Sequence, residues 1–164
     1  MTATQRILKA RQALATLTPL KMDCGKLCGA ACCHGDEEGK GGMVLFPGEE
    51  ALYPATGPDH ALLTPCPTFP GQFLYTCDGT CLRSARPLAC RIFPLTPRIR
   101  EGKLALEMDV RAWPVCPLME QGLRALSQPF VQAVRAVMED LFADAACRAY
   151  FEALSRHLDA YEHF

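Results

Sequence analysis

The sequence predicts a mainly α-helical fold with one small β-hairpin, in which an irregular, proline- and glycine-rich cysteine region is held by metal and packs on helices at both ends. Three observations predict this class. Helical periodicity of apolar residues is confined to the two ends of the 164-residue chain. Eleven of the thirteen prolines lie between positions 47 and 117, which excludes long helices there. Nine of the ten cysteines lie between positions 24 and 116.

We expect one domain over residues 1–164, because a chain of this length can bury a core of its own. It divides into an N-terminal helix (1–19), a cysteine-rich metal-binding zone (20–117) and a C-terminal helical scaffold (118–164). The content of 49% hydrophobic and 21% charged residues is typical of a globular protein. The net charge of −1 gives no reason to expect a nucleic acid as partner. No apolar run approaches the roughly 18 residues that cross a bilayer, so no membrane partner is expected.

The first helix is expected over residues 3–17. Thr2 or Thr4 can cap its N-terminus, and Pro19 ends it. Near one face of this helix lie Ile7, Leu8, Leu14 and Leu17.

Two short β elements are expected in the middle zone. Residues 43–46 form a strand that Pro47 and Gly48 end. Residues 98–109 form a hairpin with its turn at Glu101-Gly102. One face of that hairpin is expected to carry Leu104, Leu106 and Met108.

The C-terminal zone carries two helices that serve as scaffold. Ser127 is the expected N-cap of the first, with Pro129 in its first turn, and Asp144 can cap the second. Cys147 lies on the second helix and is expected to be a buried structural thiol. The apolar stripe of the first helix consists of Phe130, Val131, Val134, Val137, Met138, Leu141 and Phe142.

A dense run of cysteines opens the middle zone, at positions 24, 28, 32 and 33. On a helical turn, Cys24, Cys28 and Cys32 would share one face. Because the neighbours Cys32 and Cys33 point in different directions, we expect one of them to reach a second metal, a polynuclear cluster or the core. Thiolates are soft ligands that select zinc, copper(I) or iron–sulfur clusters.

A second group of cysteines follows along the chain, at positions 66, 77, 81 and 90, and Cys116 ends the zone. Asp78-Gly79 is expected to turn the loop between Cys77 and Cys81, which brings two sulfur atoms together as in a zinc knuckle. Arg86 and Arg91 flank Cys90 and can donate hydrogen bonds to thiolates or to backbone carbonyls.

These segments resemble the YkgJ-type cysteine-cluster family, which is described as a zinc- or iron-chelating domain. The resemblance covers about residues 22–117 and rests on the Cys32-Cys33 pair and on the string from Arg86 to Pro94, which reads RPLACRIFP. A flagellin lysine methylase belongs to the wider group, so a methyltransferase-like activity is one implication. The eight family cysteines would be Cys24, Cys28, Cys32, Cys33, Cys66, Cys81, Cys90 and Cys116.

The predicted function is metal binding, with zinc or an iron–sulfur cluster as the cofactor and the metal ion as the partner. The alternative is an iron–sulfur redox enzyme or a methyltransferase-related enzyme, so the question of catalysis stays open and leans to none. His34 is a further candidate ligand, and acid–base chemistry by Glu49 and Glu50 is a weak alternative to their place in a helical first turn. The candidate metal ligands are Cys24, Cys28, Cys32, Cys33, Cys66, Cys77, Cys81, Cys90 and Cys116.

The expected compartment is the cytoplasm. Arg6, Lys9 and Arg11 are spread through the first 17 residues, which leaves no continuous apolar stretch, and no small-residue cleavage site follows, so this segment is not read as a secretory signal. In a reducing compartment, clustered cysteines are more often metal ligands or catalytic thiols than disulfides. A disulfide-bonded secreted module remains the third reading.

Overall fold

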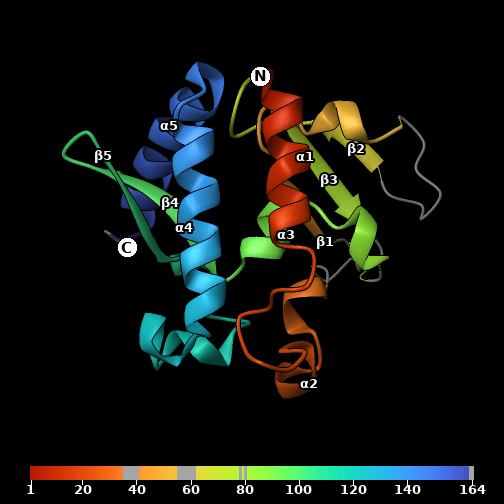
Figure 1. Ribbon diagram of the computed structural model, residues 1–164, viewed down its shortest axis with the longest axis vertical. Coiled ribbons are helices and arrows are strands. Elements are labelled where there is room, and N and C mark those ends of the chain that lie inside the picture. The colour runs from red at the N-terminus through yellow and green to blue at the C-terminus, as the bar shows by residue number, and fades with distance from the viewer. Residues whose placement is uncertain (35–40, 55–61, 78, 80, 163–164) are drawn as a thin grey trace.

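A computed structural model describes residues 1–34, 41–54, 62–77, 79 and 81–162. These ranges contain five α-helices, several short 3-10 turns and two antiparallel sheets (Figure 1). The helices are α1 (Ala3–Ala13), α2 (Gly25–Cys28), α3 (Leu88–Ile92), α4 (Gln128–Phe142) and α5 (Ala145–Glu162).

In the structure the predicted C-terminal scaffold is joined by α1 and by the hairpin of β4 (Leu95–Arg100) and β5 (Lys103–Met108). From here on, the scaffold means α1, α4, α5 and this hairpin. Helices α1 and α4 lie side by side, and α5 packs on β4 (Figure 1). The Ile99 backbone N–H donates to Ser155 Oγ at 2.7 Å, which ties the hairpin to α5. The core of this half contains Ile7, Leu14, Leu95, Phe130, Val134, Leu141, Phe151 and Leu158.

The helix caps follow the sequence with one difference. Thr2 caps α1 in a reciprocal arrangement with Gln5, and Asp144 Oδ1 accepts from the Ala146 and Cys147 backbone N–H groups. Ser127 occupies the cap position of α4, but its side chain makes no capping hydrogen bond. Its own backbone N–H instead donates to the Pro19 carbonyl at 2.7 Å, which joins α4 to the chain after α1.

The predicted hairpin is confirmed. Its turn lies at Glu101-Gly102, both with positive φ (52° and 75°), as a two-residue hairpin turn requires. Leu106 is buried in the core, and Leu104 and Met108 pack against it from the same face.

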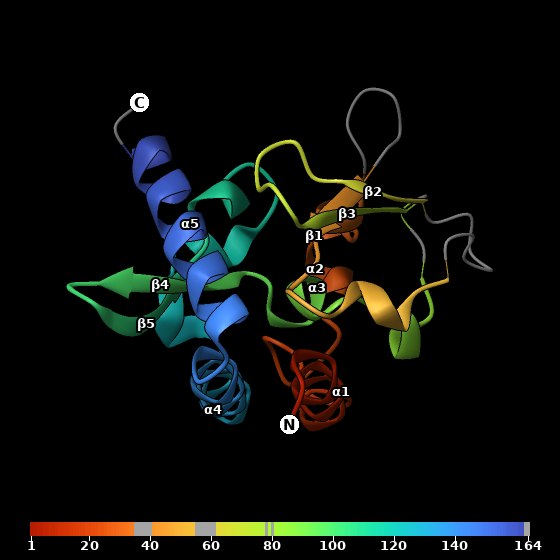
Figure 2. The same cartoon turned by 90° about the horizontal axis from the view of Figure 1, so that it is seen from above.

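A second, three-stranded sheet lies on the other side of the molecule (Figure 2). Its order is β1 (Gly41–Val44), β3 (Phe73–Cys77), β2 (Leu62–Pro65), with both pairs antiparallel. Strand β1 begins and ends two residues before the predicted strand 43–46, whereas β2 and β3 were not predicted.

The predicted mainly α-helical class is therefore wrong. The structure is of the mixed α/β class, with 49% helix and 16% strand, and a three-stranded sheet lies within the zone expected to be irregular. The prolines are tolerated because Pro65 ends an edge strand and Pro97 lies in a two-stranded sheet whose strands both have an open edge. At Gly42 a Cβ atom would lie 2.9 Å from the Tyr75 carbonyl oxygen. In this zone a proline lies at the end of a strand, and a glycine lies where two strands come into close contact.

Helix α1 is also shorter than the predicted range 3–17. It ends at Ala13, and Leu14 forms its C-cap. Ile7, Ala10 and Leu14 are buried, whereas Leu8 is 44% exposed and does not belong to the buried face. Pro19 lies six residues after the last helical residue, Ala13, beyond a turn at Leu14 and a bend at residues 15–16.

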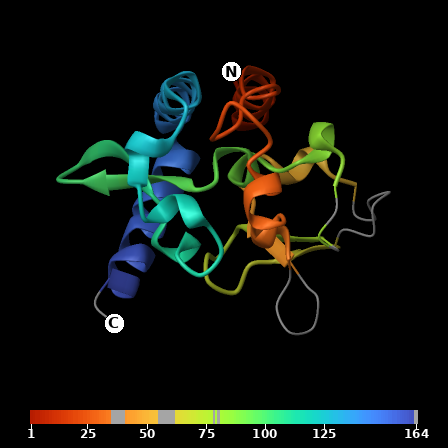
Figure 3. The same cartoon turned by 90° about the horizontal axis from the view of Figure 1, so that it is seen from below.

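The first cysteine segment lies over the middle of the molecule, next to α3 and to the turns at residues 117–125 (Figure 3). The two sheets flank α3 (Figure 2). None of the helices in the described ranges combines the length and the apolar character that crossing a bilayer requires.

Candidate metal centre

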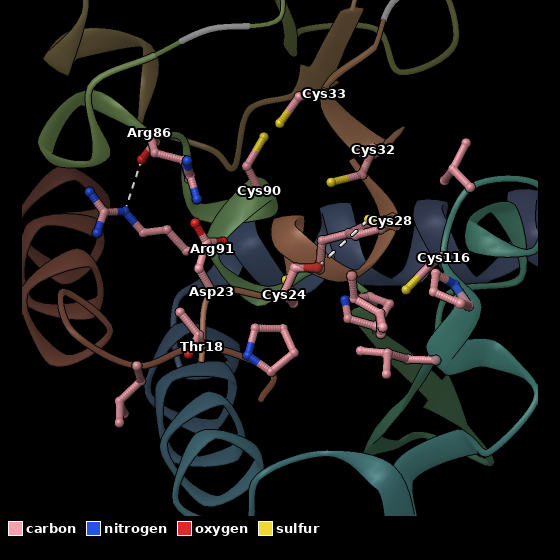
Figure 4. Close-up of a pocket in the computed structure, with 18 of the residues that line it drawn as sticks. Thr18, Asp23, Cys24, Cys28, Cys32, Cys33, Arg86, Cys90, Arg91 and Cys116 are labelled. Carbon is pink, nitrogen blue, oxygen red and sulfur yellow. Dashed lines mark hydrogen bonds between the residues drawn. The ribbon is translucent and has the colours of Figure 1, made fainter. Parts of the chain in front are cut away.

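A cavity of about 100 Å³ lies where the first cysteine segment, α3 and the chain around Cys116 meet (Figure 4). Its wall is partly apolar, with Leu17, Leu27 and Phe93 among the lining residues. Six of the nine candidate ligands line it: Cys24, Cys28, Cys32, Cys33, Cys90 and Cys116.

The first cysteine segment does not form the single helical turn that the spacing predicted. Helix α2 ends at Cys28, because Gly29 and Ala30 both take left-handed backbone conformations (φ 62° and 58°). A 3-10 turn, Ala31–Cys33, follows. Glycine adopts this conformation freely, whereas an alanine there costs about 1 kcal/mol. The reversal places Cys32 and Cys33 back beside α2 and over α3 (Figure 4).

Cys32 and Cys33 differ in their surroundings. The Cys32 thiol donates a hydrogen bond to the Cys33 sulfur, and together with Arg86 and His34 this lowers the pKa of Cys33 to about 6. The same hydrogen bond, with burial, raises the pKa of Cys32. Cys33 is therefore the thiol of the pair that carries negative charge most readily.

Cys90 lies on α3, and its sulfur faces that of Cys33 (Figure 4). Burial raises its pKa, and the charges of Cys33, Cys81 and Cys77 raise it further. An isolated thiolate is therefore disfavoured at this position, and a positively charged partner would stabilise it.

Arg91, the next residue on α3, acts as a structural clamp. Its guanidinium donates to the carbonyl oxygens of Arg86 (2.9 Å), Arg83 (2.7 Å) and Ser84 (3.0 Å). The sequence left thiolates and carbonyls open as partners of Arg91, and the observed partners are carbonyls. The clamp holds the 3-10 turn Arg83–Ala85 against α3.

Glu49 positions α3 from the opposite end. Its side chain is fully buried, and Oε1 accepts from the Leu88 backbone N–H at 2.7 Å while Oε2 accepts from Phe46 at 3.3 Å. Burial raises the pKa of Glu49 to about 7 against these hydrogen bonds and the nearby Arg11. Both oxygens are engaged by the backbone, so Glu49 is a helix-end acceptor. No local signal predicts this role, because Leu88 is 39 residues away along the chain.

Gly79, between Cys77 and Cys81, packs against the first cysteine segment. Gly79 has φ +88°, and a Cβ atom there would lie 2.9 Å from the Cys33 carbonyl oxygen, so glycine is required. The other residue of the predicted turn, Asp78, lies outside the described residues, as does Thr80. Cys81 accepts a hydrogen bond from the Arg86 side chain, which also lies near Cys33 and Cys90.

The remaining candidates are distributed as follows. Cys116 lines the cavity on the side of the C-terminal turns (Figure 4). Cys66 does not join the cavity and is buried in the hydrophobic core, near Tyr150. Cys147 is buried in the core, as expected, and burial raises its pKa to about 12. His34 is exposed beside Cys33.

The donor set fits a soft metal by its chemistry, because six thiols surround one cavity and a guanidinium lies beside them. The sulfur atoms around the cavity are not yet arranged as the coordination shell of a metal ion. Among the described residues, no three His, Cys, Asp or Glu side chains already form a group able to hold an ion. The sulfur atoms would have to draw together on binding, as ligands do when metal binding and folding are coupled.

Comparison with family models, with curated proteins and with solved structures gives no match, so the fold and the site rest on the residues of this chain alone.

Proposed function

We propose that this protein binds a soft metal, as zinc or as an iron–sulfur cluster, through the cysteines around the cavity. One observation carries the proposal: cysteines from three separated segments, residues 24–33, Cys90 and Cys116, line the same cavity. Convergence of so many thiols from distant parts of a chain favours a shared ligand, because hydrophobic packing alone does not select cysteine.

Two physical features support the proposal. Residues 20–34 contain no buried residue, so apolar burial contributes little to their order, and a bound metal would supply folding free energy there. Arg86 would offset the negative charge that several thiolates accumulate around a metal.

Clustered thiols also persist best in a reducing compartment, which makes the cytoplasm the proposed location.

The decisive measurement is elemental analysis and an absorption spectrum of protein purified without oxygen. Stoichiometric zinc, or iron with inorganic sulfide, is expected. Cys28→Ser and Cys90→Ser should lose metal, because both thiols line the cavity.

Cys147→Ala is the matched control, because it removes a thiol from the core, away from the cavity lining, and adds no polar group. Its metal content should equal that of the unmodified chain. A metal-free protein in which all six cavity thiols react with a thiol reagent in the native fold would contradict the proposal.

The cavity itself favours a second function, a metal centre that acts on a small molecule. Its apolar wall (Leu17, Leu27, Phe93) lies beside the thiols and leaves room for more than an ion. Electron paramagnetic resonance of the dithionite-reduced protein tests the redox form of this function. A reversible iron–sulfur signal supports it, and a protein that contains only zinc rules that form out.

A further inference from the structure

We infer that the cysteines form two neighbouring mononuclear metal centres, each with four sulfur ligands. This inference rests on the proposed metal-binding function and specifies its sites. The first centre consists of Cys24, Cys28, Cys32 and Cys116. The second centre consists of Cys33, Cys77, Cys81 and Cys90.

The first centre is built around α2. Cys28 Sγ lies 3.8 Å from the Cys24 carbonyl oxygen, so the helical turn brings both cysteines to one side. Cys116 faces them across the cavity, and the charge of Cys28 reaches both Cys24 and Cys116. Cys32 completes the group, because it lines the same cavity as Cys24 and Cys28 and interacts electrostatically with both.

The second centre is built around α3. The sulfurs of Cys33 and Cys90 face each other (Figure 4). The thiols whose charge reaches Cys90 are Cys33, Cys81 and Cys77. Gly79, between Cys77 and Cys81, lies so close to Cys33 that an added Cβ atom would be 2.9 Å from the Cys33 carbonyl oxygen.

The division between the centres falls within the Cys32-Cys33 pair. Both residues belong to a 3-10 turn, in which successive side chains point about 120° apart. Their sulfur atoms are hydrogen-bonded neighbours, so the pair can supply one sulfur to each of two adjacent ions. In Figure 4 Cys33 points toward Cys90, whereas the Cys32 sulfur lies between this pair and Cys28.

The charges around the two centres differ. Arg86 bonds to Cys81 and lies near Cys33 and Cys90, all in the second centre. Asp23 lies near Cys24 in the first centre and also near Cys33 in the second, so Arg86 is the charge that distinguishes the two centres. A divalent ion with four thiolates carries a net charge of −2, which a guanidinium stabilises and a carboxylate destabilises. A chelator should therefore remove the metal of the first centre before that of the second.

Cys66 is excluded from both centres by its place in the core. Cys77 takes the eighth position instead, although the family resemblance had assigned that position to Cys66. The assignment inferred from the structure makes Cys77 a ligand and leaves Cys66 out, whereas the family resemblance implies the reverse.

The test is titration of the full-length, metal-free protein with cobalt(II), followed by thiolate-to-cobalt charge-transfer absorption. Saturation at two equivalents is expected. Cys28→Ser and Cys90→Ser should each bind one equivalent, and Cys66→Ala should bind two. The within-centre double variant Cys28→Ser/Cys116→Ser should keep one equivalent, whereas the cross-centre double variant Cys28→Ser/Cys90→Ser should bind none.

Cadmium-113 NMR of the unmodified protein needs no variant to fold and should show two resonances of four-sulfur type. A single resonance, saturation at one equivalent, or native protein that contains iron with inorganic sulfide would overturn the two-centre assignment while leaving metal binding intact. Loss of all metal from both Cys28→Ser and Cys90→Ser would also overturn the two-centre assignment, since it indicates one polynuclear centre. A protein that binds neither cobalt nor cadmium would instead remove the proposed function itself.

Discussion

Helices α4 and α5 bury six residues each, whereas residues 20–34, which carry the first four cysteines, bury none. The scaffold is therefore ordered by apolar burial and ring packing, such as the stacked pair Phe142 and Phe151. The first cysteine segment is held by a few backbone hydrogen bonds and by its contacts around the cavity. The two regions therefore depend on different sources of free energy, and the proposed metal would supply the one that the cysteine segment lacks.

Removal of the metal is the strongest way to break this comparison. Structural zinc supplies about 10 kcal/mol or more to small cysteine-rich sites. Chelation should therefore speed amide hydrogen exchange in residues 24–33 and leave residues 128–162 protected. Equal loss of protection in both ranges would show that the two regions form one cooperative unit.

The converse change, Phe151→Ala, removes a buried aromatic side chain from the core of the scaffold. Phe151 is fully buried against Phe46 and Phe142, so truncation should lower the free energy of unfolding by about 3–5 kcal/mol. Denaturant unfolding followed by circular dichroism measures the loss. Glu152→Ala, on the exposed side of the same helix, is the control and should change stability by less than about 0.5 kcal/mol.

Glu49→Gln tests the connection between the regions. Because the pKa of Glu49 rises from 4.5 to about 7 on folding, the native state binds the proton more tightly than the unfolded chain does. The free energy of unfolding should therefore fall as the pH rises through this window, by up to about 3 kcal/mol.

The glutamine variant should lack this part of the pH dependence. Unfolding curves of both proteins from pH 5 to pH 8 measure it, because the difference between the two cancels the other titrating groups. Parallel pH profiles would show that the Glu49 proton plays no part in stability.

Arg86→Gln should have the smallest effect. Loss of the guanidinium beside Cys81 should weaken metal binding about ten- to hundredfold, as removal of an outer-shell partner does. Competition with a chromophoric chelator measures the affinity. Arg135→Gln, on the exposed face of α4, should leave the affinity unchanged. Equal affinities in the two variants would indicate that charge compensation at the thiols comes from elsewhere.

Most of the scaffold could be predicted from the sequence, because its signals are local. The period of the apolar residues in α4, the cap at Asp144 and the turn at Glu101-Gly102 each act over a few residues. The three-stranded sheet could not be predicted, since its strands are short and β1 pairs with β3, a strand some thirty residues away in the chain. Prolines at strand ends concealed it further.

The candidate site divides in the same way. The candidate ligands of a soft metal could be identified from residue types alone, because the ten cysteines are the thiol donors of this chain. The tertiary structure decided which of them meet: it turned the segment at Gly29 and Ala30, placed Cys33 opposite Cys90, and put Cys66 in the core. The physical reason is that ligand chemistry belongs to a residue type, whereas convergence depends on contacts between residues that are far apart in the chain.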